Sequence, residues 1–172
     1  GNSPQALTGN PLTFFNLVVN KTNKTDTVTV VGKLKVTKKL TVTKGKLISA
    51  SDYGDIEIGD DGELELTSDI SVSGSFTMTG DATFTPNTYA VIFNGATEQN
   101  VAWENYAAFW NLAVMTDTIL IEVNPADNVG IDNELTNYGT IRKTQTVTAT
   151  TPNFYYFGLA GNYPVGANGY GM

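Results

Sequence analysis

Carboxylates are the side chains in this sequence best suited to chemistry, and they are densest in SDYGDIEIGDDGELELTSD at residues 51–69. Oxygen ligands of this kind suit calcium, and the candidate ligands are Asp52, Asp55, Asp60 and Asp61. The spacing of an EF-hand loop is absent, and Asp-Asp-Gly equally suits a turn. We therefore expect no cofactor, with calcium as the alternative. A second acidic segment, NPADNVGIDNE at residues 124–134, has the same two interpretations.

Pairs of carboxylates also suggest glycoside hydrolysis, in which two acids act on opposite sides of the scissile bond. The candidate pairs are Asp60 with Asp61 and Asp127 with Asp132. The sequence contains no Cys and no His, which excludes a thiolate nucleophile, a Ser-His-Asp triad and a Cys/His zinc site. Elimination from an acidic polysaccharide would need a cationic base, and the single arginine, Arg142, is far from the lysines in sequence. We expect no enzyme, and a glycan hydrolase or lyase is the weaker alternative.

Aromatic residues provide a possible sugar-stacking platform. Phe14 and Phe15 have counterparts in Phe109 and Trp110, a repetition that favours packing. Trp103 and Tyr106 have no aromatic counterpart in the first copy, so they are the better ligand candidates. A polysaccharide-binding module is therefore the alternative function.

Charge is distributed unevenly along the chain. The net charge is −7, yet eight of the ten basic residues lie between residues 21 and 46, and the segment 47–140 contains acids only. The lysines alternate with Leu and Val without interleaved aromatics, which disfavours nucleic-acid binding. We expect ion pairs between neighbouring coils, with Lys33 and Lys35 near Asp55 and Glu57, and Lys39 near Glu63. The full set of expected interaction residues is Lys33, Lys35, Lys39, Lys46, Glu57, Glu63, Glu65, Trp103 and Tyr106.

Two short patterns are compatible with surface roles. Asn20 and Asn23 begin acceptor sequons for N-glycosylation, which matter only if the source organism glycosylates its surface proteins. Threonine is abundant, but it does not form a regular T-x-T ladder, so we do not favour an ice-binding solenoid.

The elements that position these residues are β-strands. KLKVT, KLTVT, DIEIG, ELELT and VIFNG alternate β-branched or aliphatic residues with polar ones, which is the pattern of half-buried strands. Successive strand starts between residues 33 and 82 are six to nine residues apart, and segments such as TKK and TKG suit corners better than reversals. Three such strands make a coil of about 20 residues, so we predict an all-β parallel β-helix, with a β-sandwich as the alternative.

A long repeat is visible in the same sequence. TFFNLVV at residues 13–19 returns as AFWNLAV at residues 108–114, and Gln5 returns as Gln99, each four residues after a glycine. We predict a solenoid domain over residues 1–150 with a repeat of about 95 residues, the second copy starting near residue 95, followed by a Tyr/Gly-rich extension over 151–172. We also expect Asn16 and Asn111 to occupy equivalent positions on the coil. The first copy lacks the preceding VIFNG strand, which suggests a neighbour at that place.

The pattern VIFNG…Q…FWNL followed by KLTVTKGKLIS-like strands resembles the repeat units of large bacterial cell-surface and secreted adhesin-like proteins with a right-handed, pectate-lyase-like β-helix. LTNYGTIRKTQTVTAT at residues 135–150 resembles a segment that closes such units. The resemblance covers roughly residues 1–150 and implies an extracellular scaffold without catalytic residues.

The expected function is structural. No run of 18 apolar residues is present, and GNSPQALTG lacks the features of a signal peptide, so we expect neither membrane insertion nor a leader in this sequence. We expect an extracellular or cell-surface adhesive module that stacks into a fibre or surface layer. Its expected partners are further copies or neighbouring repeats, head to tail, with a surface glycan as another possibility and no nucleic acid.

Overall fold

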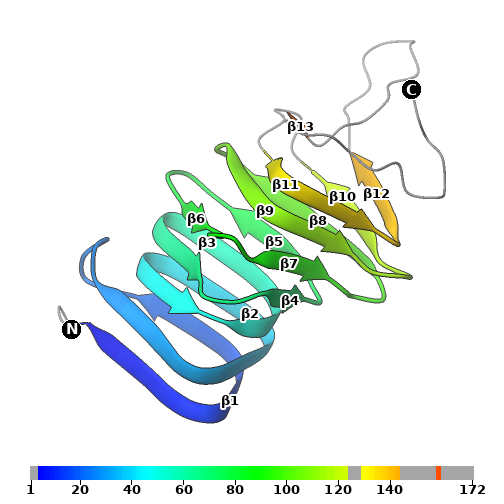
Figure 1. Cartoon of the computed structure of the whole chain (residues 1–172). Helices are drawn as coiled ribbons and strands as arrows, with labels where there is room; N and C mark the ends of the chain where they lie inside the picture. The colour runs from blue at the N-terminus through cyan, green and yellow to red at the C-terminus, as the bar shows by residue number, and fades with distance from the viewer. Residues whose placement is uncertain (1–3, 124–128, 144–157, 160–172) are drawn as a thin grey trace.

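The fold is a parallel β-solenoid of about six turns (Figure 1). The computed structural model describes residues 4–123, 129–143 and 158–159, and these residues contain strands and no helix. Every strand pairing among them is parallel, with stacked coils spaced by about 21 residues. The predicted all-β parallel β-helix is therefore confirmed, and the β-sandwich alternative is not the fold. No helix in the described part is long and apolar enough to cross a membrane.

The first three strands are long because they bend around the corners of the coil without interruption. They are β1 (Gln5–Asn20), β2 (Thr27–Ser49) and β3 (Ser51–Leu66). Later coils are divided into shorter strands, namely β4 (Ile70–Val72), β5 (Phe76–Met78), β6 (Thr83–Thr85), β7 (Ala90–Phe93), β8 (Glu98–Trp103), β9 (Ala107–Val114), β10 (Ile119–Glu122), β11 (Val129–Asn137), β12 (Thr140–Lys143) and β13 (Gly158–Leu159).

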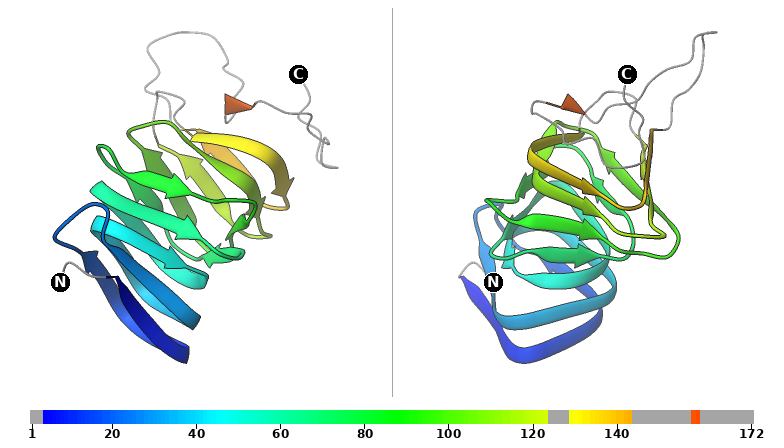
Figure 2. Two further views of the ribbon diagram at one scale, coloured as in Figure 1. Left: turned by 60° about the vertical axis from the view of Figure 1, so that its left-hand side comes forward. Right: turned by 45° about the vertical axis from the view of Figure 1, so that its right-hand side comes forward.

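Each complete coil has three faces, which we name A, B and C in chain order. Face A contains residues 34–36, 51–53, 70–72, 90–93, 111–114 and 134–137. Face B contains residues 39–42, 55–58, 76–78, 98–103, 119–122 and 140–143. Face C contains residues 46–49, 63–66, 83–85, 107–109 and 129–131. Figure 2 shows the coils stacked with β1 at the N-terminal end.

Period-two alternation determines which side chains fill the coil. Apolar residues of each strand point inward, as at Leu40, Ile58 and Leu64, all of which are fully buried, while the residues between them reach the outer surface. In the middle coils the interior is aromatic, with ring centroids 4.7–6.1 Å apart among Phe76, Phe84, Phe93, Trp103 and Phe109. The core is one continuous column along the solenoid axis.

The corners follow the TKK and TKG segments, as predicted. β2 passes both segments without ending, and its pairing with β3 shifts register between Val36 and Lys39 and again between Val42 and Lys44. Gly45 in the second segment has a φ of +91°, a conformation that glycine adopts without strain. The chain therefore bends at these places while its backbone hydrogen bonds to the next coil continue on both sides.

The two copies of the repeated heptad lie on different faces of the solenoid. Asn16 pairs with Lys39 at the start of face B, whereas Asn111 pairs with Ala90 and Glu134 on face A. Both copies pass around a corner in the same way, at Phe15 and at Trp110, but one face apart. The expectation that Asn16 and Asn111 occupy equivalent positions on the coil is therefore wrong, because 95 residues do not make a whole number of coils.

Candidate functional site

The outer surface between β2 and β3 carries a row of ion pairs that join two neighbouring coils. Lys39 pairs with Glu57, Lys44 Nζ lies 3.1 Å from Asp61 Oδ2, and Lys46 pairs with both Glu63 and Glu65. The charge pattern predicts ion pairs between neighbouring coils, but with other partners. Because all of the observed pairs join one strand rich in lysine to one rich in acids, they favour a single register of β2 against β3.

The partners of individual lysines differ from the prediction. Lys35 is in register with Asp52, and Lys39 forms its ion pair with Glu57, so neither meets the acid expected for it. The reason is coil length: Leu40 pairs with Ile56, sixteen residues further along, whereas the prediction assumed about 20 residues for every coil. Lys33 is exposed at the start of face A.

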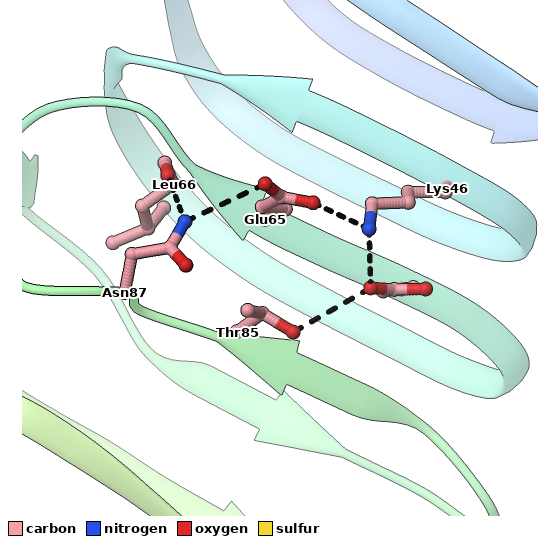
Figure 3. Close-up of polar contacts among 6 residues, drawn as sticks. Lys46, Glu65, Leu66, Thr85 and Asn87 are labelled. Atoms are coloured by element: carbon pink, nitrogen blue, oxygen red, sulfur yellow. Dashed lines mark hydrogen bonds and ion pairs between the residues drawn. The ribbon is translucent and has the colours of Figure 1, made fainter.

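Lys46 is at the centre of the most connected polar cluster in this row (Figure 3). Its Nζ lies 2.8 Å from Glu63 Oε1 and also contacts Glu65. Asn87 Nδ2 donates a hydrogen bond of 3.5 Å to Glu65 Oε1 and one of 2.8 Å to the carbonyl of Leu66, so the cluster reaches the next coil. The hydrogen bonds to Glu63 and Glu65 raise the pKa of Lys46, and the hydrogen bond from Lys46 lowers the pKa of Glu65.

The calcium candidates do not converge on one point. Asp52 lies on face A, whereas Asp55 begins face B and its Oδ1 accepts a hydrogen bond of 2.8 Å from the Ser75 amide. Asp60 and Asp61 lie at the corner between faces B and C, and Asp61 is paired with Lys44. Among the described residues, no group of three or more Asp or Glu side chains is placed to hold a metal ion. Calcium binding therefore remains an untested prediction.

Among the described residues, the candidate catalytic pairs do not have an arrangement typical of glycosidases. Asp60 and Asp61 are consecutive residues of one corner, so they do not lie on opposite sides of a cleft. Asp132 is exposed on β11, and its proposed partner Asp127 lies outside the described residues. The structure thus provides no positive support for hydrolysis, and the expectation of a non-enzymatic protein remains untested.

The structure corrects the assignment of Trp103 as a ligand-stacking residue. Its side chain is 0% exposed and packs 5.3 Å from Phe76 and 4.7 Å from Phe109, measured between ring centroids. The segment NVAW contained the signal, because the period of two that buries Val101 also buries Trp103. Tyr106, by contrast, is 65% exposed and remains accessible to a ligand.

The first coil has an open end. Leu12, Phe14 and Leu17 point into the solenoid but are only partly buried, whereas their register partners Leu34, Val36 and Leu40 are at most 3% exposed. Within the described chain β1 pairs with β2 alone, so its other edge is free of strand pairing. The apolar column is therefore uncovered at this end, where β1 forms the terminal coil of the stack (Figure 2).

Gln99, a residue without an assigned role in the sequence analysis, shows how one coil is joined to the preceding coil. Its side chain is fully buried, and its Nε2 donates hydrogen bonds of 2.9 Å to the carbonyl of Val72 and 2.6 Å to that of Gly74. Its Oε1 accepts a hydrogen bond of 2.8 Å from the Gly95 amide. The glycine and glutamine shared by both repeat copies were the signal for this role.

Gln5, the counterpart of Gln99, lies in the coil with the open end. Gln5 Oε1 accepts a hydrogen bond of 2.9 Å from the buried Lys21 ammonium group. Gln5 is in register with Val28, an inward-pointing residue, yet it is exposed. The two side chains therefore form a polar group at the uncovered end of the core.

A polar groove runs along the corner between faces A and B. Its cavity volume is about 390 Å³. Its lining includes Lys35, Thr37, Asp52, Ser71, Ser73 and Asn94, which come from four successive coils. The groove has no sequence signal, because its residues are far apart in the chain and belong to no motif.

Comparisons with known proteins leave the function to be argued from this geometry. No protein-family model, no curated protein and no solved structure matches the chain significantly.

Proposed function

We propose that this chain is an extracellular, adhesive structural module without catalytic activity, which assembles lengthwise when the first coil of one copy docks against a second copy. The observation that carries the proposal is the open end of the solenoid at β1. There, apolar side chains whose register partners Leu34, Val36 and Leu40 are buried remain partly accessible, and a strand edge is available for pairing.

The physical driving force is the completion of the core. A parallel coil laid on β1 would cover Leu7, Leu12, Phe14 and Leu17, and burial of apolar surface contributes roughly 25 cal/mol for each Å² removed from water. It would also supply backbone partners along a strand of 16 residues. Since the two ends of a solenoid differ, head-to-tail contacts of this kind continue into a filament.

The surface location and the adhesive role depend on the resemblance of the strand pattern to cell-surface repeat proteins. The described structure supports this part of the proposal only through the fold, because it is a solenoid as those repeats are. Labelling of intact cells of the source organism with an antibody to the folded module is the direct test. Signal that requires cell permeabilisation would overturn the extracellular assignment.

The assembly itself is tested by light scattering and electron microscopy of the purified chain at low salt. We expect particles larger than one chain, in lengthwise arrays. Phe14→Lys places a charge at the uncovered core and should abolish assembly, whereas Phe15→Lys changes a neighbouring side chain that is 66% exposed and should leave assembly intact. Circular dichroism of both variants shows whether the remaining coils stay folded.

Two results would contradict the proposal. One is a strictly monomeric wild-type chain at millimolar concentration. The other is equal assembly of the folded Phe14→Lys and Phe15→Lys variants, which would place the contact elsewhere on the molecule.

A further inference from the structure

The groove at the corner between faces A and B has a floor of backbone and short side chains. Tyr53 and Val36 point into the core, being 2% and 1% exposed, so they leave little bulk outside. Gly54 follows Tyr53 in β3 at this corner. A Cβ atom at this position would be 2.1 Å from the carbonyl oxygen of Lys38 in β2. The hollow is thus a consequence of a tight corner that only glycine can form.

The rim of the groove contains two opposite charges that do not neutralise each other directly. Lys35 and Asp52 are in register on β2 and β3, yet among the described residues neither forms an ion pair. On the same two strands, Lys44 and Lys46 do bond to their register partners. The ammonium and carboxylate groups at the groove are therefore available to a ligand.

The remaining polar groups are hydroxyls and one amide, arranged along the solenoid axis. Ser71 continues the line of Lys35 and Asp52 on face A, while Ser73 and Asn94 follow the corner in the next coils. Strands of neighbouring coils are about 4.8 Å apart, so these groups recur at regular intervals comparable to the length of one pyranose ring.

These features together favour a sugar over a peptide. The backbone groups of the flanking strands are already paired with neighbouring coils, so an extended peptide finds no free strand edge here. A ligand recognised by side-chain hydroxyl, amide and charged groups is rich in hydroxyl groups itself. The cavity of about 390 Å³ is also within the range of small-molecule sites.

We propose that this groove binds a short oligosaccharide that carries a carboxylate on one terminal residue. The carboxylate binds the Lys35 ammonium group, a sugar hydroxyl donates to the Asp52 carboxylate, and further hydroxyls bond to Ser73 and Asn94. The lysine-rich segment that contains Lys35 favours the anionic end at this residue. The site is independent of the proposed assembly, because the open edge belongs to β1 and the groove begins at β2.

The test is an NMR titration of the full chain with cellobiuronate, a glucuronate–glucose disaccharide, and with neutral cellobiose as its matched partner. We expect chemical-shift changes at Lys35, Asp52, Ser73 and Asn94, and weaker binding of cellobiose. Lys35→Gln should weaken cellobiuronate binding about tenfold, since it removes a charge-assisted hydrogen bond. Asp52→Asn should weaken the binding of both sugars.

Lys33→Gln is the matched control, because it removes an exposed lysine that does not line the groove. Its cellobiuronate affinity should equal that of the wild type. Absence of chemical-shift changes with millimolar cellobiuronate would overturn the proposal. Equal losses of cellobiuronate affinity in Lys33→Gln and Lys35→Gln would also overturn it, because they would indicate attraction by the overall positive charge of this segment. Equal affinity for the two sugars would overturn the assignment of the carboxylate to Lys35.

Discussion

Lys46 Nζ lies 2.8 Å from Glu63 Oε1 on the neighbouring coil and also contacts Glu65, which is on the same strand as Glu63. The lysine thereby connects two outward-pointing acids that would otherwise repel each other. All three side chains are about a quarter exposed, so the interaction is less screened than a pair fully in water. This relationship predicts that the stability of the contact between β2 and β3 depends on pH.

The Lys46 cluster predicts how stability depends on pH. Because the pKa of Glu65 is below its ordinary value of 4.5 in the folded protein, the contribution of the cluster is present above that value and is lost as the pH falls through the lowered pKa. The pKa of Lys46 is raised above 10.5, so the contribution is fully present below 10.5 and is lost as the pH rises through the raised value. Between these limits it should be constant.

Replacing Lys46 tests this dependence. Lys46→Met should lower the free energy of unfolding by about 1 kcal/mol at neutral pH, and the difference from the wild type should shrink in acid, below pH 4.5. Urea unfolding followed by circular dichroism at both pH values measures it. Lys24→Met, in the exposed segment between β1 and β2, is the control and should have little effect at either pH. A pH-independent loss in Lys46→Met would contradict the assignment.

The aromatic core predicts a large cost for removing Trp103. Trp103→Ala should destabilise the fold by about 3–5 kcal/mol, because the indole is fully buried against Phe76 and Phe109. Tyr106→Ala, three residues later and largely exposed, should change stability by no more than about 0.5 kcal/mol. Thermal unfolding of the two variants separates a core position from a surface one. Equal effects would show that Trp103 is not buried as described.

Much of the architecture could be predicted from the sequence because each strand carries its own signal. Leu64 and Leu66 alternate with Glu63 and Glu65, and the same alternation marks β2, β4, β5 and β7. The partners of individual side chains could not be predicted, because they depend on the length of each coil. Coil length changes with the corners and has no simple sequence signal.

The coils differ in length by enough residues to change every pairing between neighbouring coils. Leu40 and Ile56 are register partners sixteen residues apart, whereas Phe76 and Val101 are partners twenty-five residues apart. An error of one residue moves every side chain to the opposite face, since neighbouring residues of a strand point to opposite faces, and an error of two keeps the face but changes which side chains meet. For the same reason the groove and the displacement of the two heptad copies appear only in the folded chain.

The tight corner below the groove predicts that two glycines of β3 respond differently to the same substitution. Gly54→Ala would place a Cβ atom 2.1 Å from the Lys38 carbonyl oxygen, and because this atom is backbone the corner must move, at a cost of about 1–3 kcal/mol. Gly59→Ala would place its Cβ 3.5 Å from the nearest atom, which is ordinary contact. Unfolding free energies of the two variants provide the comparison. Similar values would mean that β3 packs less tightly on β2 at the corner between faces A and B than the structure shows.

The two glutamines of the repeat predict different effects on stability and on assembly. Gln99→Leu leaves the carbonyls of Val72 and Gly74 and the amide of Gly95 without the partners that Gln99 supplies, at a cost of about 1–3 kcal/mol for each group left unsatisfied. Within the described chain Gln5→Leu removes one part-buried hydrogen bond, the one that Lys21 donates, so the isolated module should lose less stability.

The same pair distinguishes folding from docking. If Gln5 bonds to the carbonyls of a docked coil as Gln99 bonds to those of the coil before it, Gln5→Leu should weaken assembly while the unfolding midpoint of the monomer stays near that of the wild type. Analytical ultracentrifugation measures the association, and urea unfolding at low protein concentration measures the stability of the monomer. Unchanged association of Gln5→Leu would show that the amide of Gln5 has no part in the contact. Gln99→Leu should show the opposite pattern, because its hydrogen bonds are internal and the edge of β1 is unaltered.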